Sequence, residues 1–256
     1  MWHAGHKRRS FLCRLRSESG VIDVTSLTKT FGALYALRGI DLHIEEGSSL
    51  SILGPNGAGK STFIRILSTL SKATSGTVTI SGLDIGKEPQ KIRRRLGVIS
   101  HATYLYDELT AEENLRFYAT MYDLTEIDER ISQVLNEVDL YARRNDRVRT
   151  YSRGMQQRLS IARAMLHQPD ILYLDEPYTG LDQHAAKMLT DWLAKLRSQK
   201  RTIVLVTHNL THGLAFADRV AIFLRGKVAY NEPANALDLT RFQQTYFDLI
   251  AKGKTA

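Results

Sequence analysis

The segment GPNGAGKS at residues 54–61 carries the clearest chemical signal in the sequence. It fits the spacing G-x-x-x-x-G-K-[ST], in which glycines let backbone N–H groups close around a polyphosphate. In such a loop Lys60 would reach the β- and γ-phosphates, and the Ser61 hydroxyl would ligate Mg²⁺. The residues expected to contact the nucleotide here are Gly54, Pro55, Asn56, Gly57, Ala58, Gly59, Lys60, Ser61 and Thr62. An ordinary Gly-rich turn is the alternative.

Two adjacent carboxylates, Asp175 and Glu176, follow the apolar run at residues 171–174. A buried parallel strand would deliver both to its carboxyl end, where α/β sheets bind ligands. Asp175 is expected to hold Mg²⁺. Glu176 should face the opposite way, because side chains alternate along a strand, and polarise an attacking water as general base. A solvated acidic turn before Pro177 is the alternative.

Asp182, in the segment TGLD, and His208, after the run at residues 202–206, extend this set. A neutral imidazole at a strand end beside the acid pair could donate a hydrogen bond to the γ-phosphate. Lys60, Glu176 and His208 are therefore the expected catalytic residues. A surface histidine is the alternative reading of His208.

The elements around these residues read as alternating strands and helices. Phe63, Leu67 and Leu70 fall at i, i+4 and i+7 after the Gly-rich loop, which predicts an amphipathic helix whose apolar stripe includes all three. The predicted strands are residues 21–24, 39–44, 49–53, 77–80, 97–99, 171–174, 202–206, 220–224 and 228–230. This alternation is typical of a sheet with packed helices.

Strand patterns vanish between about residues 110 and 166. Thr110 and Glu113 have the spacing of a helix capping box, and Leu115, Tyr118 and Tyr122 continue one apolar stripe. The sequence therefore predicts a helical insertion within the α/β protein.

Composition is that of an ordinary globular protein, with 43% hydrophobic and 24% charged residues. No apolar run approaches the roughly 20 residues that cross a bilayer, and the N-terminus lacks the apolar stretch of a secretory signal, so a cytoplasmic location is expected. The single cysteine, Cys13, excludes an intramolecular disulfide.

The net charge of +8 raises the question of nucleic acid, but its distribution argues against such a partner. Residues 1–20 hold five lysines and arginines against one glutamate, so this segment carries half of the net charge. It is expected to be a basic, disordered extension, and a weak attraction to anionic lipid is the functional alternative.

The segment YSRGMQQR at residues 151–158 resembles the signature of ABC ATPases, usually written LSGGQxQR. The matching residues are Ser152, Gly154, Gln157 and Arg158, whereas Tyr151, Arg153 and Met155 replace the usual types. Together with the phosphate loop, the acid pair, TGLD and His208, all in family order, the chain resembles an ABC ATPase over about residues 21–230.

This resemblance implies the ABC ATPase fold, an α/β P-loop NTPase core with an antiparallel β subdomain. A helical subdomain at about residues 101–166 would be inserted in it, and residues 231–256 would form a C-terminal helical segment. It also implies ATP and Mg²⁺ as ligands and a head-to-tail dimer, most simply a homodimer. Ser152 and Gly154 would then touch the γ-phosphate in trans, and Asp182 would lie at the dimer seam.

Two further positions come from the resemblance. Phe31 stands where the family places an aromatic that stacks on adenine, with a core or turn aromatic as the alternative. His101 occupies the position of a glutamine that senses the γ-phosphate, and it could still ligate Mg²⁺ or hydrogen-bond.

Within the family the sequence is most similar to the ATPase of haem exporters of the cytochrome c maturation system. The resemblance then implies a peripheral subunit on the cytoplasmic side of the plasma membrane, bound to separate integral membrane subunits near residues 101–114. Tyr104, Leu105 and Tyr106 are candidates for that contact, with burial inside the insertion as the alternative. Export of a drug, lipid or polysaccharide is the runner-up, followed by a non-transport ABC ATPase.

Overall fold

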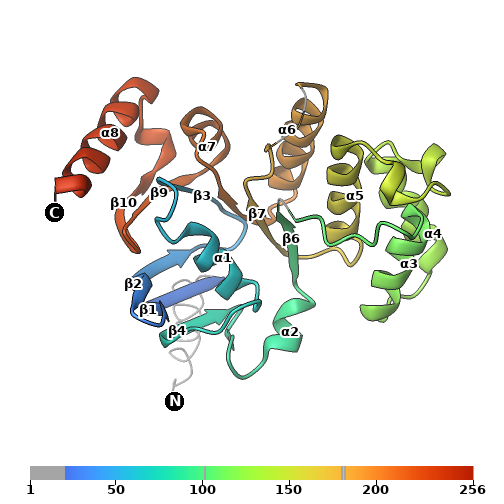
Figure 1. Cartoon of the computed structure of the whole chain (residues 1–256), viewed down its shortest axis with the longest axis horizontal. Coiled ribbons are helices and arrows are strands. Elements are labelled where there is room, and N and C mark those ends of the chain that lie inside the picture. Colours follow the sequence, from blue (N-terminus) through green and yellow to red (C-terminus); the bar gives the residue numbers. More distant parts are fainter. Residues whose placement is uncertain (1–20, 101, 180, 182, 256) are drawn as a thin grey trace, which may run out of the picture.

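The structure, a computed structural model, describes residues 21–100, 102–179, 181 and 183–255, and for residues 184 and 253–255 it describes the backbone alone. Two sheets and a set of flanking helices build the described part of the chain (Figure 1). The predicted extension at residues 1–20 lies outside the described residues.

The larger sheet has six strands in the order β10-β9-β3-β8-β7-β6. Its strands are β3 (Ser49–Leu53), β6 (Leu96–Ser100), β7 (Ile171–Asp175), β8 (Thr202–Val206), β9 (Arg219–Leu224) and β10 (Lys227–Pro233). All pairings are parallel except that of β9 with β10. Every residue of β3, β7 and β8 is buried, because this sheet is covered on both faces.

The smaller sheet is antiparallel, in the order β2-β1-β4-β5. Its strands are β1 (Ile22–Phe31), β2 (Leu34–Ile44), β4 (Ser75–Ile80) and β5 (Leu83–Asp84). The sequence predicted only residues 21–24 and 39–44 of the β1–β2 hairpin. The hairpin runs on to the turn at Gly32, whose φ of 58° is in the left-handed region.

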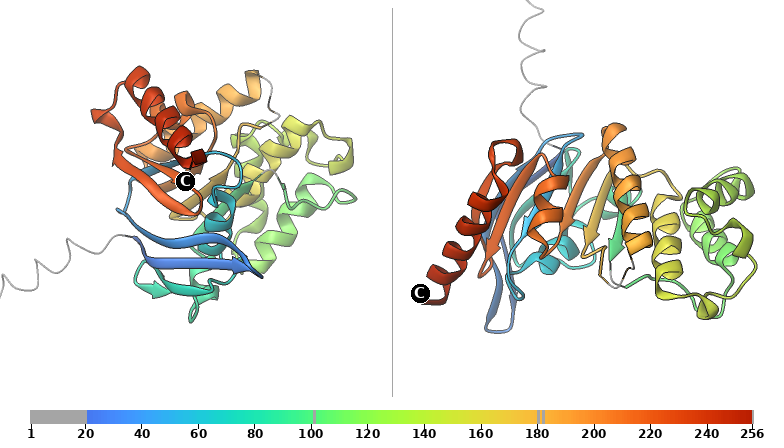
Figure 2. Two further views of the ribbon diagram at one scale, coloured as in Figure 1. Left: turned by 60° about the vertical axis from the view of Figure 1, so that its left-hand side comes forward. Right: turned by 90° about the horizontal axis from the view of Figure 1, so that it is seen from above.

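Helices lie on both faces of the six-stranded sheet and beyond its edges (Figure 2). They are α1 (Lys60–Leu67), α2 (Pro89–Arg93), α3 (Ala111–Met121), α4 (Ile127–Glu137), α5 (Arg153–Met165), α6 (Gln183–Ser198), α7 (Leu210–Phe216) and α8 (Leu239–Thr255), with 3₁₀ turns at Tyr141–Arg143, Val148–Thr150 and Ala234–Ala236. No helix of the described residues has both the length and the apolar content that crossing a membrane requires. The α3–α4 pair and α8 lie at opposite ends of the molecule (Figure 2).

Strand alternation assigns the core to these two faces. Tyr173 and Val204 pack with α1 and the antiparallel sheet, whereas their neighbours Leu172 and Leu205 pack with the helices of the insertion and α6. A third cluster joins β9 to α8 through Phe242. The P-loop NTPase core, the antiparallel subdomain and the helices of the insertion predicted as the fold class are all present.

Helix α1 is shorter than its apolar pattern predicts. It ends at Leu67, and Thr69 takes a left-handed φ of 61°, so the chain leaves the helix before Leu70. Leu70 is 50% exposed instead of lying on the buried stripe with Phe63 and Leu67. The expected role of Leu70 in the core was wrong, because helical periodicity cannot show where the helix stops.

The capping box predicted at the start of the insertion is confirmed. The Thr110 hydroxyl accepts a hydrogen bond from Glu113 N, and the Glu113 carboxylate accepts one from Thr110 N. Asn114, fully buried, then clamps the preceding loop through both the N–H and the C=O of Tyr106. These bonds fix the backbone at Tyr106 relative to the start of α3.

The end of α5 is joined to the sheet and to α3 through His167. Its ring stacks on Tyr122 at 3.8 Å, and its Nε2 lies 2.9 Å from the Leu96 carbonyl, to which it would donate. Its Nδ1 is buried and has no hydrogen-bond partner among the described residues. Burial lowers the pKa of His167 from 6.5 to about 4, against the opposing effect of the Leu96 carbonyl.

This burial predicts an acid-sensitive step in stability. Because the pKa of folded His167 lies below its ordinary value, the unfolded chain binds the proton more strongly, and acidification below pH 6.5 favours unfolding. We expect His167→Gln to remove up to about 3 kcal/mol of the loss in unfolding free energy between about pH 7 and pH 4. Urea unfolding at both pH values measures this difference. An equally flattened profile in His212→Gln, an exposed histidine of α7, would contradict the assignment.

Candidate functional site

The Gly-rich loop connects the carboxyl end of β3 to the start of α1, as predicted. Gly54 and Gly59 have φ values of 146° and 100°. A Cβ on Gly54 would lie 2.2 Å from the Phe223 carbonyl oxygen, and one on Gly59 would lie 2.5 Å from the Ala36 carbonyl oxygen. Close approach of neighbouring backbone therefore requires glycine at both positions.

The loop is held by β2 and by the turn between β9 and β10. Gly226 N donates to Ala58 O at 3.0 Å, and Arg38 N donates to Gly226 O at 2.8 Å. These backbone bonds connect the loop to both sheets. Its amides, at the N-terminus of α1, are thus fixed at a place where an anion is favoured.

Lys60 is the first residue of α1 and is buried. Its ammonium donates to the carbonyls of Gly54 at 2.6 Å and Pro55 at 3.0 Å. Burial lowers the pKa of Lys60, while the carboxylates of Glu176 and Asp175 act in the opposite direction. A partly desolvated cation at the mouth of this loop is a partner for phosphate oxygens.

Ser61 of α1 and Asp175 at the end of β7 lie close together. The Ser61 hydroxyl donates to Asp175 Oδ1 at 3.3 Å, and Asp175, the last residue of β7, is buried. Two neighbouring hard oxygens suit Mg²⁺, which keeps several waters and takes phosphate oxygens as further ligands. No group of three or more His, Cys, Asp or Glu side chains within the described ranges could hold a metal ion, so a cation here would need a nucleotide to complete its shell.

Glu176 lies beside His208, as the sequence analysis expected, although strand alternation is not the reason. Strand β7 ends at Asp175, and Glu176 has a left-handed φ of 51°. Its N–H donates to Val206 O at 2.9 Å, and its Oε2 lies 2.9 Å from His208 Nδ1. A backbone turn, not the pleat of a strand, therefore aims this carboxylate at the pocket.

An open pocket of about 370 Å³ lies over the loop and includes Glu176 in its wall. Phe31 and Tyr35, which are 55% and 51% exposed, line it from the two arms of the β1–β2 hairpin. Leu34 joins them at the hairpin turn. Phe31 was expected here from the sequence, whereas Leu34 and Tyr35 were not. The apolar residues just after the Gly32 turn were the signal, because a hairpin returns them to the same edge.

The signature segment lies apart from this pocket. Ser152 is exposed at the N-cap of α5 and accepts a hydrogen bond from Met155 N at 3.3 Å. Neither Ser152 nor Gly154 lines the pocket over the phosphate loop. A Cβ on Gly154 would meet nothing closer than the Ala185 Cβ at 3.8 Å. Packing within the described chain therefore does not require glycine there.

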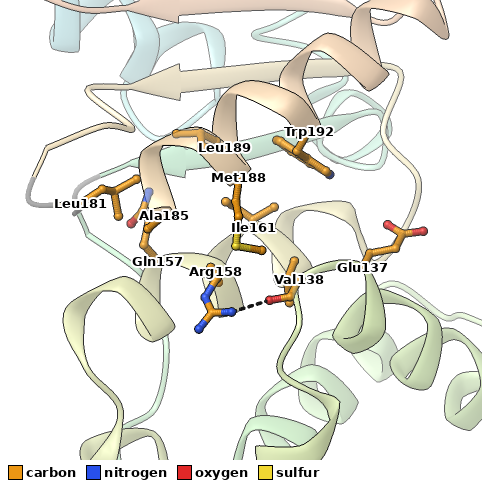
Figure 3. Close-up of a pocket in the computed structure, with 10 residues that line it drawn as sticks. All are labelled: Glu137, Val138, Gln157, Arg158, Ile161, Leu181, Ala185, Met188, Leu189 and Trp192. Carbon is orange, nitrogen blue, oxygen red and sulfur yellow. Dashed lines mark hydrogen bonds between the residues drawn. The ribbon is translucent and has the colours of Figure 1, made fainter. Parts of the chain in front are cut away.

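A much smaller cavity of about 20 Å³ lies beside the signature helix, between α5 and α6 (Figure 3). Met188 and Trp192 line it from α6, and Arg158 lines it from α5 while donating to the Val138 carbonyl at 3.1 Å. Its volume suits about one water molecule. It is a packing seam between the insertion and the core, and no nucleotide could enter it.

Two predicted site residues, His101 and Asp182, lie outside the described residues. The structure brings together Lys60, Ser61, Asp175, Glu176 and His208, with Phe31 at the far wall of the pocket. It leaves Ser152 and Gly154 outside that pocket. Fold and site together define a P-loop nucleoside triphosphatase.

The family follows from comparison with known proteins. Residues 37–179 match the family model described as ABC transporter. The chain is 36% identical to the ABC transporter ATP-binding protein NatA of Bacillus subtilis over 205 residues, which cover 79% of this chain and 83% of NatA. The chain belongs to the ABC transporter family and is an ATP-binding, ATP-hydrolysing member of it.

Other relatives carry more specific names. The daunorubicin/doxorubicin resistance ATP-binding protein DrrA of Streptomyces peucetius is 36% identical, over 81% of this chain and 63% of its own length. The Nod factor export ATP-binding protein I of Cupriavidus metallidurans is 32% identical, over 86% of this chain and 74% of its own length. None of these three names mentions haem.

A solved structure agrees in fold. It is a dimeric ATP-binding cassette in a post-hydrolysis state with bound ADP and Pi, 31% identical in sequence, with a TM-score of 0.77. The match covers 83% of this chain and 98% of that one. The predicted ABC ATPase fold is confirmed.

The geometry of Lys60 predicts the effect of removing it. We expect Lys60→Ala to weaken ATP binding by about 100-fold, because charge-assisted hydrogen bonds to the phosphates, worth about 1.5–3 kcal/mol each, are lost. Titration with a fluorescent ATP analogue measures the dissociation constant. Lys227→Ala, at an exposed lysine of β10, is the matched control. An unchanged constant for Lys60→Ala would reject the role of this loop.

Proposed function

We propose that this chain is the ATP-driven motor subunit of an exporter, and that it binds ATP with Mg²⁺ in the pocket over the phosphate loop. The observation that carries the proposal is that Lys60 and Glu176 line that one pocket, with His208 in contact with the Glu176 carboxylate. A Gly-rich cradle supplies phosphate binding, and a carboxylate held by an imidazole supplies a base.

In this proposal each side chain has a separate task. The Lys60 ammonium exchanges its two loop carbonyls for β- and γ-phosphate oxygens, and Phe31 and Tyr35 offer ring faces for the adenine. Glu176 accepts the proton of the attacking water, and the N–H that His208 directs at Glu176, on a side chain that is 69% exposed, would turn to the γ-phosphate when ATP is bound. Mg²⁺ beside Ser61 and Asp175 would neutralise phosphate charge.

The position of the signature segment supports a dimer. Ser152 and Gly154 do not line the pocket of their own chain, and a Cβ on Gly154 would make only ordinary contacts, the nearest with the Ala185 Cβ at 3.8 Å. We infer that the signature of one copy completes the pocket of a second copy, head to tail, with the α5 N-terminus directed at the γ-phosphate. The related cassette with bound ADP and Pi is dimeric. Asp182 at the seam stays a prediction.

The loop after β6 offers a surface for a membrane partner. Tyr106 and Phe117 are exposed, and their rings meet edge to face at 5.1 Å. Asn114 fixes the backbone of Tyr106, so this surface is preformed. We propose that separate integral membrane subunits bind here and hold the chain at the cytoplasmic side of the plasma membrane. Tyr104 is also exposed, whereas Leu105 packs into the core of the insertion. A coupling or Mg²⁺ role for His101 stays a prediction.

The transported molecule is proposed only as a class. A relative named for Nod factor export and one named for drug resistance support export of a drug, lipid or polysaccharide. The more specific expectation, haem export for cytochrome c maturation, gains no support from these relatives. Support for haem export would require that haem stimulates the ATPase activity of the intact complex.

The general-base role is tested by Glu176→Gln. We expect ATP binding to be kept and turnover to fall by about 100-fold or more, because the variant cannot accept a proton. The trapped ATP should also hold the chain as a dimer, which size-exclusion chromatography with light scattering detects. Glu129→Gln, at an exposed position of α4, controls for loss of charge. Turnover near the wild-type rate in Glu176→Gln would place the base elsewhere.

The partner surface is tested by Tyr106→Ala and Phe117→Ala. We expect each to reduce copurification with the membrane subunits roughly ten-fold or more, as for anchor side chains of an interface. ATPase activity of the isolated chain should be unchanged, because neither residue touches the pocket. Phe247→Ala, at an exposed phenylalanine of α8, is the control. Equal loss in all three variants would count against a specific surface.

A further inference from the structure

One face of the molecule combines exposed cations with exposed large apolar side chains. It is formed by the end of α1, the helix α2 and the end of α3, and we call it the basic face. Its members are Leu70, Lys72, Lys87, Lys91, Arg93, Arg94 and Met121, and all are exposed.

Side-chain contacts connect these three elements into one surface. Arg93 of α2 donates to the Thr69 hydroxyl at 3.2 Å, next to Leu70. Arg94 pairs with Asp123 at 2.6 Å, just beyond the end of α3. Met121, which is 64% exposed, lies one helical turn after Phe117 in α3. The basic face therefore borders the Tyr106–Phe117 surface.

The positive charge of this face is only partly neutralised. Glu88 pairs with Lys91 at 2.6 Å, and Asp123 pairs with Arg94. Lys72, Lys87 and Arg93 have no ion pair among the described residues. The remaining acid, Asp84, accepts hydrogen bonds from the amides of Gly86 and Lys87 at 2.8 and 3.1 Å.

A cleft of about 410 Å³ opens beside two of these three cations. Lys72 and Arg93 line it, together with Thr69, Ser71 and Thr77. Cationic and hydroxyl donors around a cleft suit the oxygens of a phosphate ester. Asp84 also lines the cleft, so the charge around it is mixed.

We propose that the basic face binds the headgroups of anionic phospholipids at the membrane surface, with a phosphate ester in the cleft and Leu70 and Met121 reaching the apolar boundary. Cations beside exposed apolar side chains are the pattern of surfaces that lie on a membrane. An acidic protein segment would use the cations but would not explain the two apolar residues. The contact is independent of the membrane subunits and of ATP.

The full chain is tested by flotation with phosphatidylcholine vesicles, with or without phosphatidylglycerol. We expect binding only to the vesicles with phosphatidylglycerol, weakening as salt rises. The triple variant Lys72→Gln, Lys87→Gln, Arg93→Gln should bind roughly ten- to hundred-fold more weakly. The matched triple Lys187→Gln, Lys195→Gln, Lys227→Gln, at exposed lysines elsewhere, should stay within about two-fold of wild type.

Residues 1–20 are the same in the wild type and in both triple variants, so any contribution they make to vesicle binding cancels in the comparison. ATPase activity of the isolated chain reports folding and should be unchanged in both triples. Equal losses in the two triples would show attraction by net charge alone and overturn the proposal. Unchanged vesicle binding in the first triple would also overturn the proposal. So would a first triple that binds vesicles normally but no longer copurifies with the membrane subunits. These outcomes leave the ATPase assignment standing, because Glu176→Gln tests that separately.

Discussion

The site depends on the parallel register of three buried strands. Ile52 of β3 pairs with Val206 of β8, and Val206 pairs with Asp175 of β7. These three strands end side by side, so the residues that follow them lie at one edge of the sheet. They are the phosphate loop after β3, Glu176 after β7 and His208 after β8. A shift of one residue in this register would turn Asp175 away from Ser61. Burial on both faces prevents such a shift, because it would exchange two well-packed cores.

That register builds only part of a catalytic site. The six-stranded sheet positions the phosphate loop, the two acids and His208 at the ends of its strands. The signature segment is carried by α5, which packs with the insertion. In the proposed head-to-tail dimer, separating these groups on one chain would make hydrolysis conditional on a second copy, and the related cassette with bound ADP and Pi is dimeric. The open side of the pocket then has a physical purpose, since closure excludes water and strengthens the electrostatic contacts with phosphate.

The insertion also connects the site to the outside of the molecule. The loop between β6 and α3 follows a strand that pairs with β7, and it carries Tyr106, whose exposed ring meets that of Phe117 in α3. The same helix, α3, meets α2 through Arg94 and Asp123. Motion of the insertion on nucleotide binding would therefore move the proposed partner surface and the basic face together. Such coupling is what the proposed motor subunit would require.

The sequence by itself determined the chemistry. Lys60, Ser61, Asp175 and Glu176 were found from residue type and spacing, because a phosphate loop and an acid pair at a strand end are local features. The tertiary structure decided which residues come together and which are buried. It placed His208 beside Glu176 through a left-handed turn, brought Tyr35 back to the pocket along a hairpin, and exposed Leu70 where the pattern predicted burial. Spacing fixes conformation over a few residues, whereas convergence and exposure depend on the register and packing of elements far apart in the chain.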